Sequence, residues 1–359
     1  MASIQAYEIK AGKRWRVQYR SPDGVSRTKQ GFRSRREAQR WAAANTTTID
    51  QGLWCDPRAA RKTVAEIGDR WLAGRAHIKP STRRVEEIQW RKHVRPWWGR
   101  RAIGDIRPSD VQAWVAALDS SPSSIRHYHC MLAQILDSAV KDRFIAINPA
   151  RGVKLPRRVG TRKVFLTPAQ LRLVVESSRK YQSLIWLLGT TGLRWGEATG
   201  LKVGDVDFSA GRISVQRNAV LVGSKIVIGS PKTHEFRVVA VPAPVLDLLA
   251  VECAGRHPEE WLWPGRDGLP VRLPGKSGFF GAAVRRAQQV DSGIQTLSIH
   301  GLRHVAAGLM VSAGANVKVV QRQLGHASAA MTLDIYAELF DGDLDSVARV
   351  MGDLLESSC

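Results

Sequence analysis

The segment LGHASAAMTLDIYAELF, residues 324–340, places a tyrosine ten positions after a histidine. The phenol of Tyr336 can act as a nucleophile and become covalently attached to phosphorus. Its ordinary pKa of about 10 lets the phenol ionise more readily than an alcohol when cations surround it. A sugar hydroxyl can then reverse the aryl phosphodiester. With His326, these residue types favour phosphodiester chemistry.

An arginine upstream has a partner at helical spacing. In TGLRWGEATGL, residues 191–201, Arg194 and Glu197 stand three positions apart at an expected helix start after Gly192. The carboxylate can hold the guanidinium fork in place, and a fixed guanidinium can clamp two phosphate oxygens. Taken alone, such a pair is usual on protein surfaces.

A second motif is SIHGLRHVAAGLM, residues 298–310, where His300, Arg303 and His304 fall on one face of an expected helix. The two histidines have the spacing of a zinc pair. A zinc hydrolase of that kind has Glu after the first histidine, where Gly301 stands here. No acidic or cysteine third ligand is nearby, so we expect no metal.

A lysine completes the set. Lys232 lies at the tip of an expected β-hairpin in GSPKTHEFRVVAVP, and Lys225 in the preceding strand is a competing candidate. Together these side chains would stabilise charge on phosphate oxygens, protonate a leaving oxygen and supply a nucleophile. The sequence has no GxxxxGK[ST] motif, so we expect no nucleotide cofactor.

The composition indicates the partner. Lys and Arg number 54 against 32 Asp and Glu, a net charge of +22. The excess runs through every part of the chain, which favours a long footprint on a phosphate backbone over a merely basic surface. The four cysteines form no CxxC pair, and no apolar run approaches the ~18 residues of a membrane span. We expect a cytoplasmic protein with no membrane partner.

Residues 1–58 predict a small domain of three strands and one helix. The strands are expected at 4–10, 14–20 and 25–32, with a helix from the capping motif SRRE to about Ile49. Basic side chains on such a sheet could lie in a DNA groove; an accessory or dimerisation domain is the alternative. The expected DNA contacts are Arg14, Arg16, Arg20, Arg27 and Lys29.

Residues 62–155 predict an all-α domain. Thr63 and Glu66 form a capping box, and further helices are expected at 81–94, 109–119 and 123–141. The tryptophans Trp90, Trp97 and Trp98 are expected in the core rather than stacked on bases. The expected phosphate contacts are Arg83, Arg84, Arg91 and Lys92.

Residues 160–359 predict a mixed α+β, mainly helical domain after a basic linker. Thr167 and Gln170 cap a first helix, a block of strands is expected at about 212–241, and the remainder is expected to be helical.

The order Arg194, Lys232, His300-Gly-Leu-Arg303, Leu324-Gly325-His326 and Tyr336 resembles the signature of the tyrosine recombinases of the bacteriophage integrase family. The resemblance covers the whole third segment. The two upstream segments resemble that family's arm-type and core-type DNA-binding domains.

The resemblance implies a role for each matching residue. Tyr336 would form a 3′-phosphotyrosyl link, and Arg194 and Arg303 would bind the scissile phosphate. His300 and His326 would donate to that phosphate or shuttle protons.

The remaining roles follow from the same resemblance. Lys232 would protonate the departing 5′-oxygen, and Glu197 would orient Arg194 or a histidine. His304 is expected to pack in the helix or to support the site from outside it. Many relatives carry His two residues after the tyrosine, where this chain has Glu338.

The resemblance also implies partners. We expect a homotetramer on core-type and arm-type attachment sites in double-stranded DNA, with a host DNA-bending protein and a directionality factor as possible helpers. A cellular chromosome-resolving recombinase and a non-catalytic DNA-binding regulator remain alternatives. An apolar stripe in the tail predicts docking on a neighbouring protomer, packing in cis being the alternative; it comprises Val347, Met351, Leu354 and Leu355.

Overall fold

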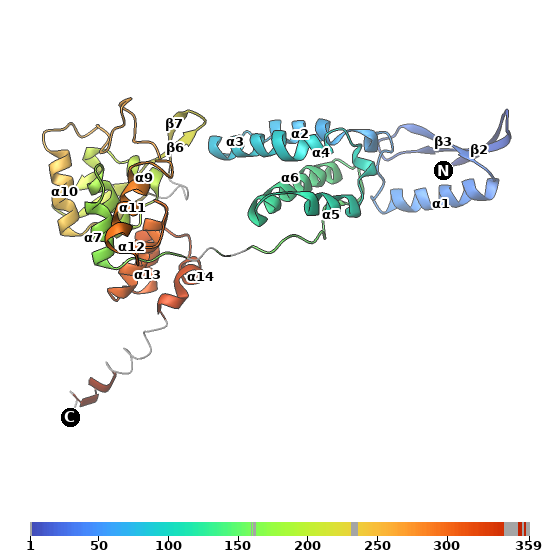
Figure 1. Cartoon of the computed structure of the whole chain (residues 1–359). Coiled ribbons are helices and arrows are strands. Elements are labelled where there is room, and N and C mark those ends of the chain that lie inside the picture. Colours follow the sequence, from blue (N-terminus) through green and yellow to red (C-terminus); the bar gives the residue numbers. More distant parts are fainter. Residues whose placement is uncertain are drawn as a thin grey trace. The chain divides into compact units, whose positions relative to one another are not determined.

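In the computed structural model, the chain divides into two compact units, residues 1–160 and 161–359 (Figure 1). The structure describes residues 2–158, 160, 163–230, 236–340, 351–353 and 355–356, with the backbone alone for 337–340. Each unit is described by itself.

The first unit begins with an antiparallel sheet. Strands β1 (Ser3–Ile9), β2 (Gly12–Arg20) and β3 (Ser26–Phe32) lie in sequence order, and α1 (Arg35–Asp50) packs on the sheet (Figure 1). The small core between them contains Val17, Phe32 and Ala38. The predicted three strands and one helix are confirmed.

Capping follows the sequence closely, with one difference. Ser34 accepts a hydrogen bond from the amide of Glu37, as expected for an N-cap. The Glu37 carboxylate accepts from the amide of Arg33 instead of that of Ser34, so the motif is not a reciprocal box. Thr63 with Glu66 and Thr167 with Gln170 do form reciprocal boxes.

A bundle of helices completes the first unit. Trp90, Trp98, Trp114 and Leu132 are among its core residues. Trp97 is 48% exposed, so its predicted core position is wrong. The elements are the short turns at Ala59–Arg61 and Ile103–Asp105, and helices α2 (Val64–Ala73), α3 (Pro80–Gln89), α4 (Arg95–Trp98), α5 (Pro108–Ala117) and α6 (Pro122–Lys141).

The helix predicted at 81–94 changes its hydrogen bonding before its end. The α-helix α3 ends at Gln89, and Trp90–Val94 form a π turn in which the amide of Arg95 bonds to the Trp90 carbonyl. The indole of Trp90 is buried and donates to Asp69 at 2.7 Å. Such turns bring a side chain to a position that the regular helix does not reach.

The second unit packs helices against two small sheets. One sheet has the order β4-β5-β8, and β6 and β7 form a separate hairpin. The strands are β4 (Val206–Asp207), β5 (Arg212–Val215), β6 (Asn218–Val222), β7 (Lys225–Gly229) and β8 (Arg237–Ala240). The helices are α7 (Pro168–Glu176), α8 (Gln182–Thr191), α9 (Trp195–Thr199), α10 (Ala243–Cys253), α11 (Phe279–Val290), α12 (Gly301–Ser312), α13 (Val317–Leu324) and α14 (Ala329–Phe340).

The core of this unit joins distant parts of the chain. Leu184 and Leu187 of α8 lie in one buried cluster with Leu302 and Val305 of α12. Residues 254–278 form no helix, so the prediction of a helical remainder is wrong for that stretch. Within the described residues, no helix is both long and apolar enough to cross a membrane.

Candidate active site

A buried carboxylate organises two arginines. Glu197 is fully buried on α9 and accepts from Nη1 of Arg194 at 2.8 Å and from Nη2 of Arg237 at 2.7 Å. Burial alone would oppose its ionisation, but the hydrogen bonds and charges of Arg237 and Arg194 hold the pKa of Glu197 down to about 2. The carboxylate is therefore ionised and fixes both guanidinium groups.

Arg303 of α12 lies in the same site. Its Nη1 donates to the carbonyl of Gly192 at 2.6 Å, whereas its buried Nη2 has no hydrogen-bond partner among the described residues. Burial lowers the pKa of Arg303 to about 10, and the charges of Arg194 and Arg237 act in the same direction. Leaving a buried donor unpaired costs about 1–3 kcal/mol, which an anionic oxygen could recover.

Two glycines allow these close approaches. Gly192 (φ +68°) and Gly325 (φ +68°) both adopt the left-handed conformation at the ends of α8 and α13. A Cβ at Gly192 would lie 2.3 Å from Leu324, and one at Gly325 would lie 2.7 Å from the guanidinium carbon of Arg237. Both turns therefore require glycine to hold the arginines where they are.

Tyr336 is buried at the same place. Its hydroxyl lies 2.9 Å from Nδ1 of His304, and its ring stacks parallel to that of His326 at 6.4 Å between centroids. Burial raises the pKa of Tyr336 to about 12, against the opposing effect of Arg303. The phenol is thus enclosed and neutral.

His326 is fixed by its neighbours. Its Nδ1 contacts the hydroxyl of buried Thr332 at 2.9 Å, and Gln321 donates to its backbone carbonyl. Burial lowers the pKa of His326 to about 4, assisted by the charges of Arg303 and Arg194. The ring is therefore neutral at physiological pH.

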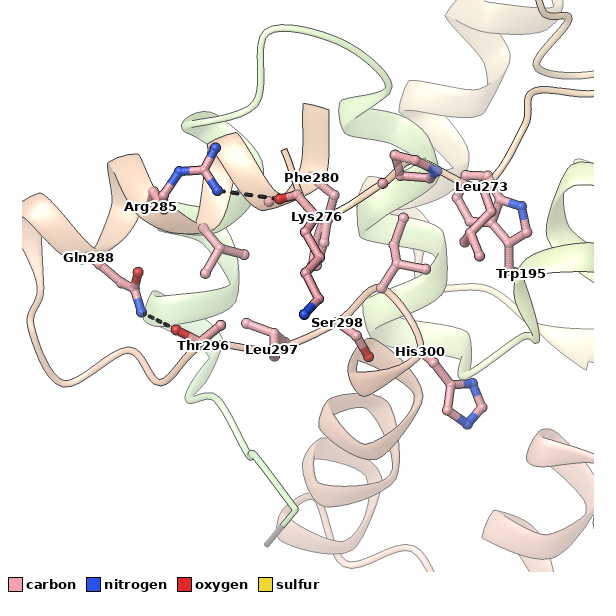
Figure 2. A pocket seen from close by; sticks show the side chains of 15 residues that line it. Trp195, Leu273, Lys276, Phe280, Arg285, Gln288, Thr296, Leu297, Ser298 and His300 are labelled. Carbon is pink, nitrogen blue, oxygen red and sulfur yellow. Dashed lines mark hydrogen bonds between the residues drawn. The ribbon is translucent and has the colours of Figure 1, made fainter. Parts of the chain in front are cut away.

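His300 lies at the beginning of α12, at the edge of a cavity of about 790 Å³. Figure 2 shows its imidazole at one end of this cavity and Gln288 at the other. Trp195, next to Arg194, also lines it. His300 and His304 lie edge to face, with ring centroids 5.9 Å apart.

The predicted lysine lies outside the described residues, since Lys232 falls within 231–235. The competing candidate Lys225 is exposed at the start of β7. Glu338 also falls where side chains are not described.

Part of each unit matches a family model. Residues 165–342 match the phage integrase family, and residues 63–118 match the phage integrase N-terminal SAM-like domain. The integrase of Mycobacterium phage D29 is 29% identical over 341 residues, covering 90% of this chain and 89% of the relative. The ICEBs1 integrase of Bacillus subtilis is 22% identical over 296 residues, covering 77% and 79%.

Solved structures agree in fold. The Tn1549 transposon integrase in complex with circular intermediate DNA superposes with a TM-score of 0.70 at 23% identity, covering 80% of this chain and 99% of that one. A lambda integrase tetramer bound to a Holliday junction gives a TM-score of 0.56 at 19% identity, covering 90% and 96%.

The chain belongs to the phage integrase family. It is a tyrosine site-specific recombinase, as the order of motifs in its second unit predicts. The described residues of this integrase contain no group of three or more His, Cys, Asp or Glu placed to hold a metal ion.

Two charged residues of this integrase's site escaped the sequence analysis. Arg237 lies in FRVVAVP, a stretch that shows only the pattern of an ordinary strand, although it donates to Glu197 through both terminal nitrogens. Lys163, just before α7, lies 5.8 Å from the Tyr336 ring centroid and donates to the Ile335 carbonyl. Both contacts join residues 40 or more positions apart, so no local pattern could reveal them.

Some of the candidate DNA-contact residues in the integrase's first unit are already paired within the protein, whereas others are exposed. Arg27 is engaged by Asp23 and Asp56 and lies over the ring of Trp54, so its charge is already paired. Arg16 donates to Gln5 on the neighbouring strand. The exposed members of the predicted set are Arg20, Lys29, Arg84, Arg91 and Lys92; Arg14 is half-buried, and Arg83 pairs with Glu87.

Proposed function

We propose that this integrase cleaves and rejoins DNA strands with Tyr336 as nucleophile, through a covalent 3′-phosphotyrosine. The observation that carries the proposal is the gathering of the phenol, His326 and Arg303 in one buried site, where Nη2 of Arg303 has no hydrogen-bond partner among the residues that the structure describes. The tyrosine oxygen forms a bond to phosphorus while the bond from phosphorus to the 5′-oxygen breaks. A DNA 5′-hydroxyl reverses the step and releases the enzyme.

Each remaining residue has a role in this step. Arg194 and Arg303 hold the non-bridging oxygens, as fixed guanidinium groups do well. His300 and His326 donate to the same oxygens or move protons. Lys232 protonates the departing 5′-oxygen. Glu197 orients Arg194, a role supported by their 2.8 Å ion pair.

The DNA partner is a pair of attachment sites. We propose that residues 62–155 and 160–359 clasp a core-type site and that residues 1–58 bind an arm-type site. Four protomers would assemble on two sites to integrate or excise a phage or mobile element in the bacterial cytoplasm. A host DNA-bending protein and a directionality factor would assist.

The C-terminal helix would join the protomers. Met351 and Leu355 are exposed in the single chain, which supports their burial against a neighbouring subunit. Val347 and Leu354 lie outside the described residues.

The test is a nicked half-site DNA incubated with the protein in EDTA. The wild-type chain should yield a covalent protein–DNA band, and Tyr336→Phe should yield none. A DNA-binding regulator would give no band from either protein, and a metal nuclease would be silenced by EDTA without forming an adduct.

Deletion of residues 1–58 tests the kind of recombinase. An integrase should lose recombination that depends on arm-type sites while still cleaving core-type half-sites. A cellular chromosome-resolving enzyme should remain fully competent.

A further inference from the structure

The Tyr336 hydroxyl has a specific partner on the neighbouring helix. Nδ1 of His304 lies 2.9 Å from the phenol oxygen, and the two rings meet edge to face with centroids 5.7 Å apart. His304 belongs to α12, which packs against α14. The contact thus joins two helices instead of neighbours in sequence.

The other described groups around the phenol are less well placed to take a proton from it. Lys163 and Arg303 are cations, and neither side chain has an acceptor. His326 lies parallel to the tyrosine ring, and its Nδ1 is already in contact with Thr332. Of the side chains that surround the phenol in the described part of the chain, His304 has a ring nitrogen within hydrogen-bond distance, and this Nδ1 accepts from the hydroxyl when the ring carries its proton on Nε2.

We propose that His304 is the general base that accepts the Tyr336 proton during strand cleavage and returns it during religation. The inference rests on the proposed nucleophilic role of Tyr336 and adds to it. The phenol proton passes to Nδ1 as the bond from the tyrosine oxygen to phosphorus forms. The bond from phosphorus to the 5′-oxygen breaks, and a separate acid protonates that oxygen.

The protonation state of His304 leaves its ring nitrogen able to accept. Burial, together with the charges of His300, Lys163 and Arg303, lowers the pKa of His304 to about 4, so the imidazole is neutral but a weak base until the charge around it changes. The pKa of Tyr336, raised to about 12 by burial, means that the phenol rarely ionises without help. A bound phosphate brings negative charge beside these cations, which favours the imidazolium that the transfer creates.

The position of His304 keeps base and phosphate together. It directly follows Arg303, so the phosphate clamp and the proton acceptor lie on the same turn of α12. A phenol that reaches phosphate held by Arg303 therefore remains within reach of His304.

The test compares single-turnover cleavage of the half-site DNA by the full chain and by His304→Asn and His304→Ala. Asparagine can still hydrogen-bond to the phenol but cannot take its proton. We expect both variants to bind DNA normally and to cleave more slowly by about 10²- to 10⁴-fold. His257→Asn, an exposed site in the same unit, is the matched control and should cleave at the wild-type rate.

Two chemical substitutions separate a base from a structural role. Fluorinated tyrosine at position 336 has a more acidic phenol, so the gap between His304→Asn and the wild-type chain should shrink. A DNA whose 5′-bridging oxygen is replaced by sulfur has a leaving group that needs no proton, so it should leave that gap unchanged.

Three results would overturn the inference. Cleavage by His304→Asn at the wild-type rate would show that no base is needed there, and faster cleavage by His304→Ala would mean that the contact restrains the phenol. Rescue by the sulfur substrate, without rescue by fluorotyrosine, would assign His304 to the leaving group. Failure of the wild-type chain to form any adduct would instead refute the proposed function.

Discussion

Replacement of Glu197 by glutamine should destabilise the second unit and also disturb the positions of the arginines in the candidate active site. The carboxylate is fully buried and balances two guanidinium groups, Arg194 and Arg237. Glutamine keeps the shape but removes the charge, and its amide group would point donors at donors. The arginines would then repel each other and Arg303 without compensation.

The size of the effect follows from the carboxylate's pKa. A shift from 4.5 in the unfolded chain to about 2 in the fold corresponds to about 3 kcal/mol of stability. Removing one partner of a buried ion pair typically costs about 3–5 kcal/mol, which agrees. Because the folded pKa is the lower one, this stability is present above pH 4.5 and is lost as the pH falls towards 2.

Urea unfolding of the full chain at neutral pH measures this loss. Glu197→Gln should lower the unfolding free energy of the second unit by about 3 kcal/mol, and the same measurement repeated between pH 4.5 and 2 should lack this carboxylate's contribution to the acid-dependent loss. Glu259→Gln, which removes an exposed carboxylate paired with Lys202, is the matched control and should unfold as the wild type does. A loss below about 0.5 kcal/mol for Glu197→Gln would refute the reasoning, since ordinary surface changes have that size.

Three further predictions concern the same site. Arg237→Gln should slow half-site cleavage more than Arg237→Lys while DNA binding persists, as measured by single-turnover kinetics and gel shift; equal rates for both would contradict a positioning role. Gly192→Ala should lower the melting temperature, with a cost of about 1–3 kcal/mol, because its Cβ would meet Leu324 at a positive φ; an unchanged melting curve would argue against this turn. His304 and His326 each have a pKa of about 4 in the folded chain, against an ordinary value of 6.5, so the unfolded chain binds protons first as the pH falls. The stability that these histidines contribute above pH 6.5 should therefore be lost towards pH 4. The urea midpoint of the wild-type chain should decline across this range, and that of a variant with glutamine at both positions should decline less.

Local patterns in the sequence predicted most of the elements. The capping residues Thr63 and Thr167 and the strand-forming stretches of the first unit act over a few positions, and the structure contains the corresponding strands and helices. Such signals are short in range, which makes them readable without the fold.

Tertiary packing decided what the sequence did not predict. The π turn at Trp90–Val94 keeps the Trp90 indole buried against Asp69, a residue from another helix. Trp97 faces outward because adjacent Trp98 takes the core position. Neither outcome follows from the residue types alone.

The candidate site likewise contains both local contacts and contacts that depend on tertiary packing. Arg194 and Glu197 pair locally, so their spacing was informative. The contact of His304 with Tyr336 spans 32 positions, and that of Arg237 with Glu197 spans 40. These depend on how α12, α14 and β8 meet, which only the folded unit specifies.

The most direct test of the account is to locate the covalent bond. The adduct trapped on a nicked half-site in EDTA would be digested with protease and nuclease and sequenced by tandem mass spectrometry. We expect one peptide that carries a 3′-nucleotide on the phenolic oxygen of Tyr336. A nucleotide on any other side chain, or cleaved DNA with no protein attached, would contradict it.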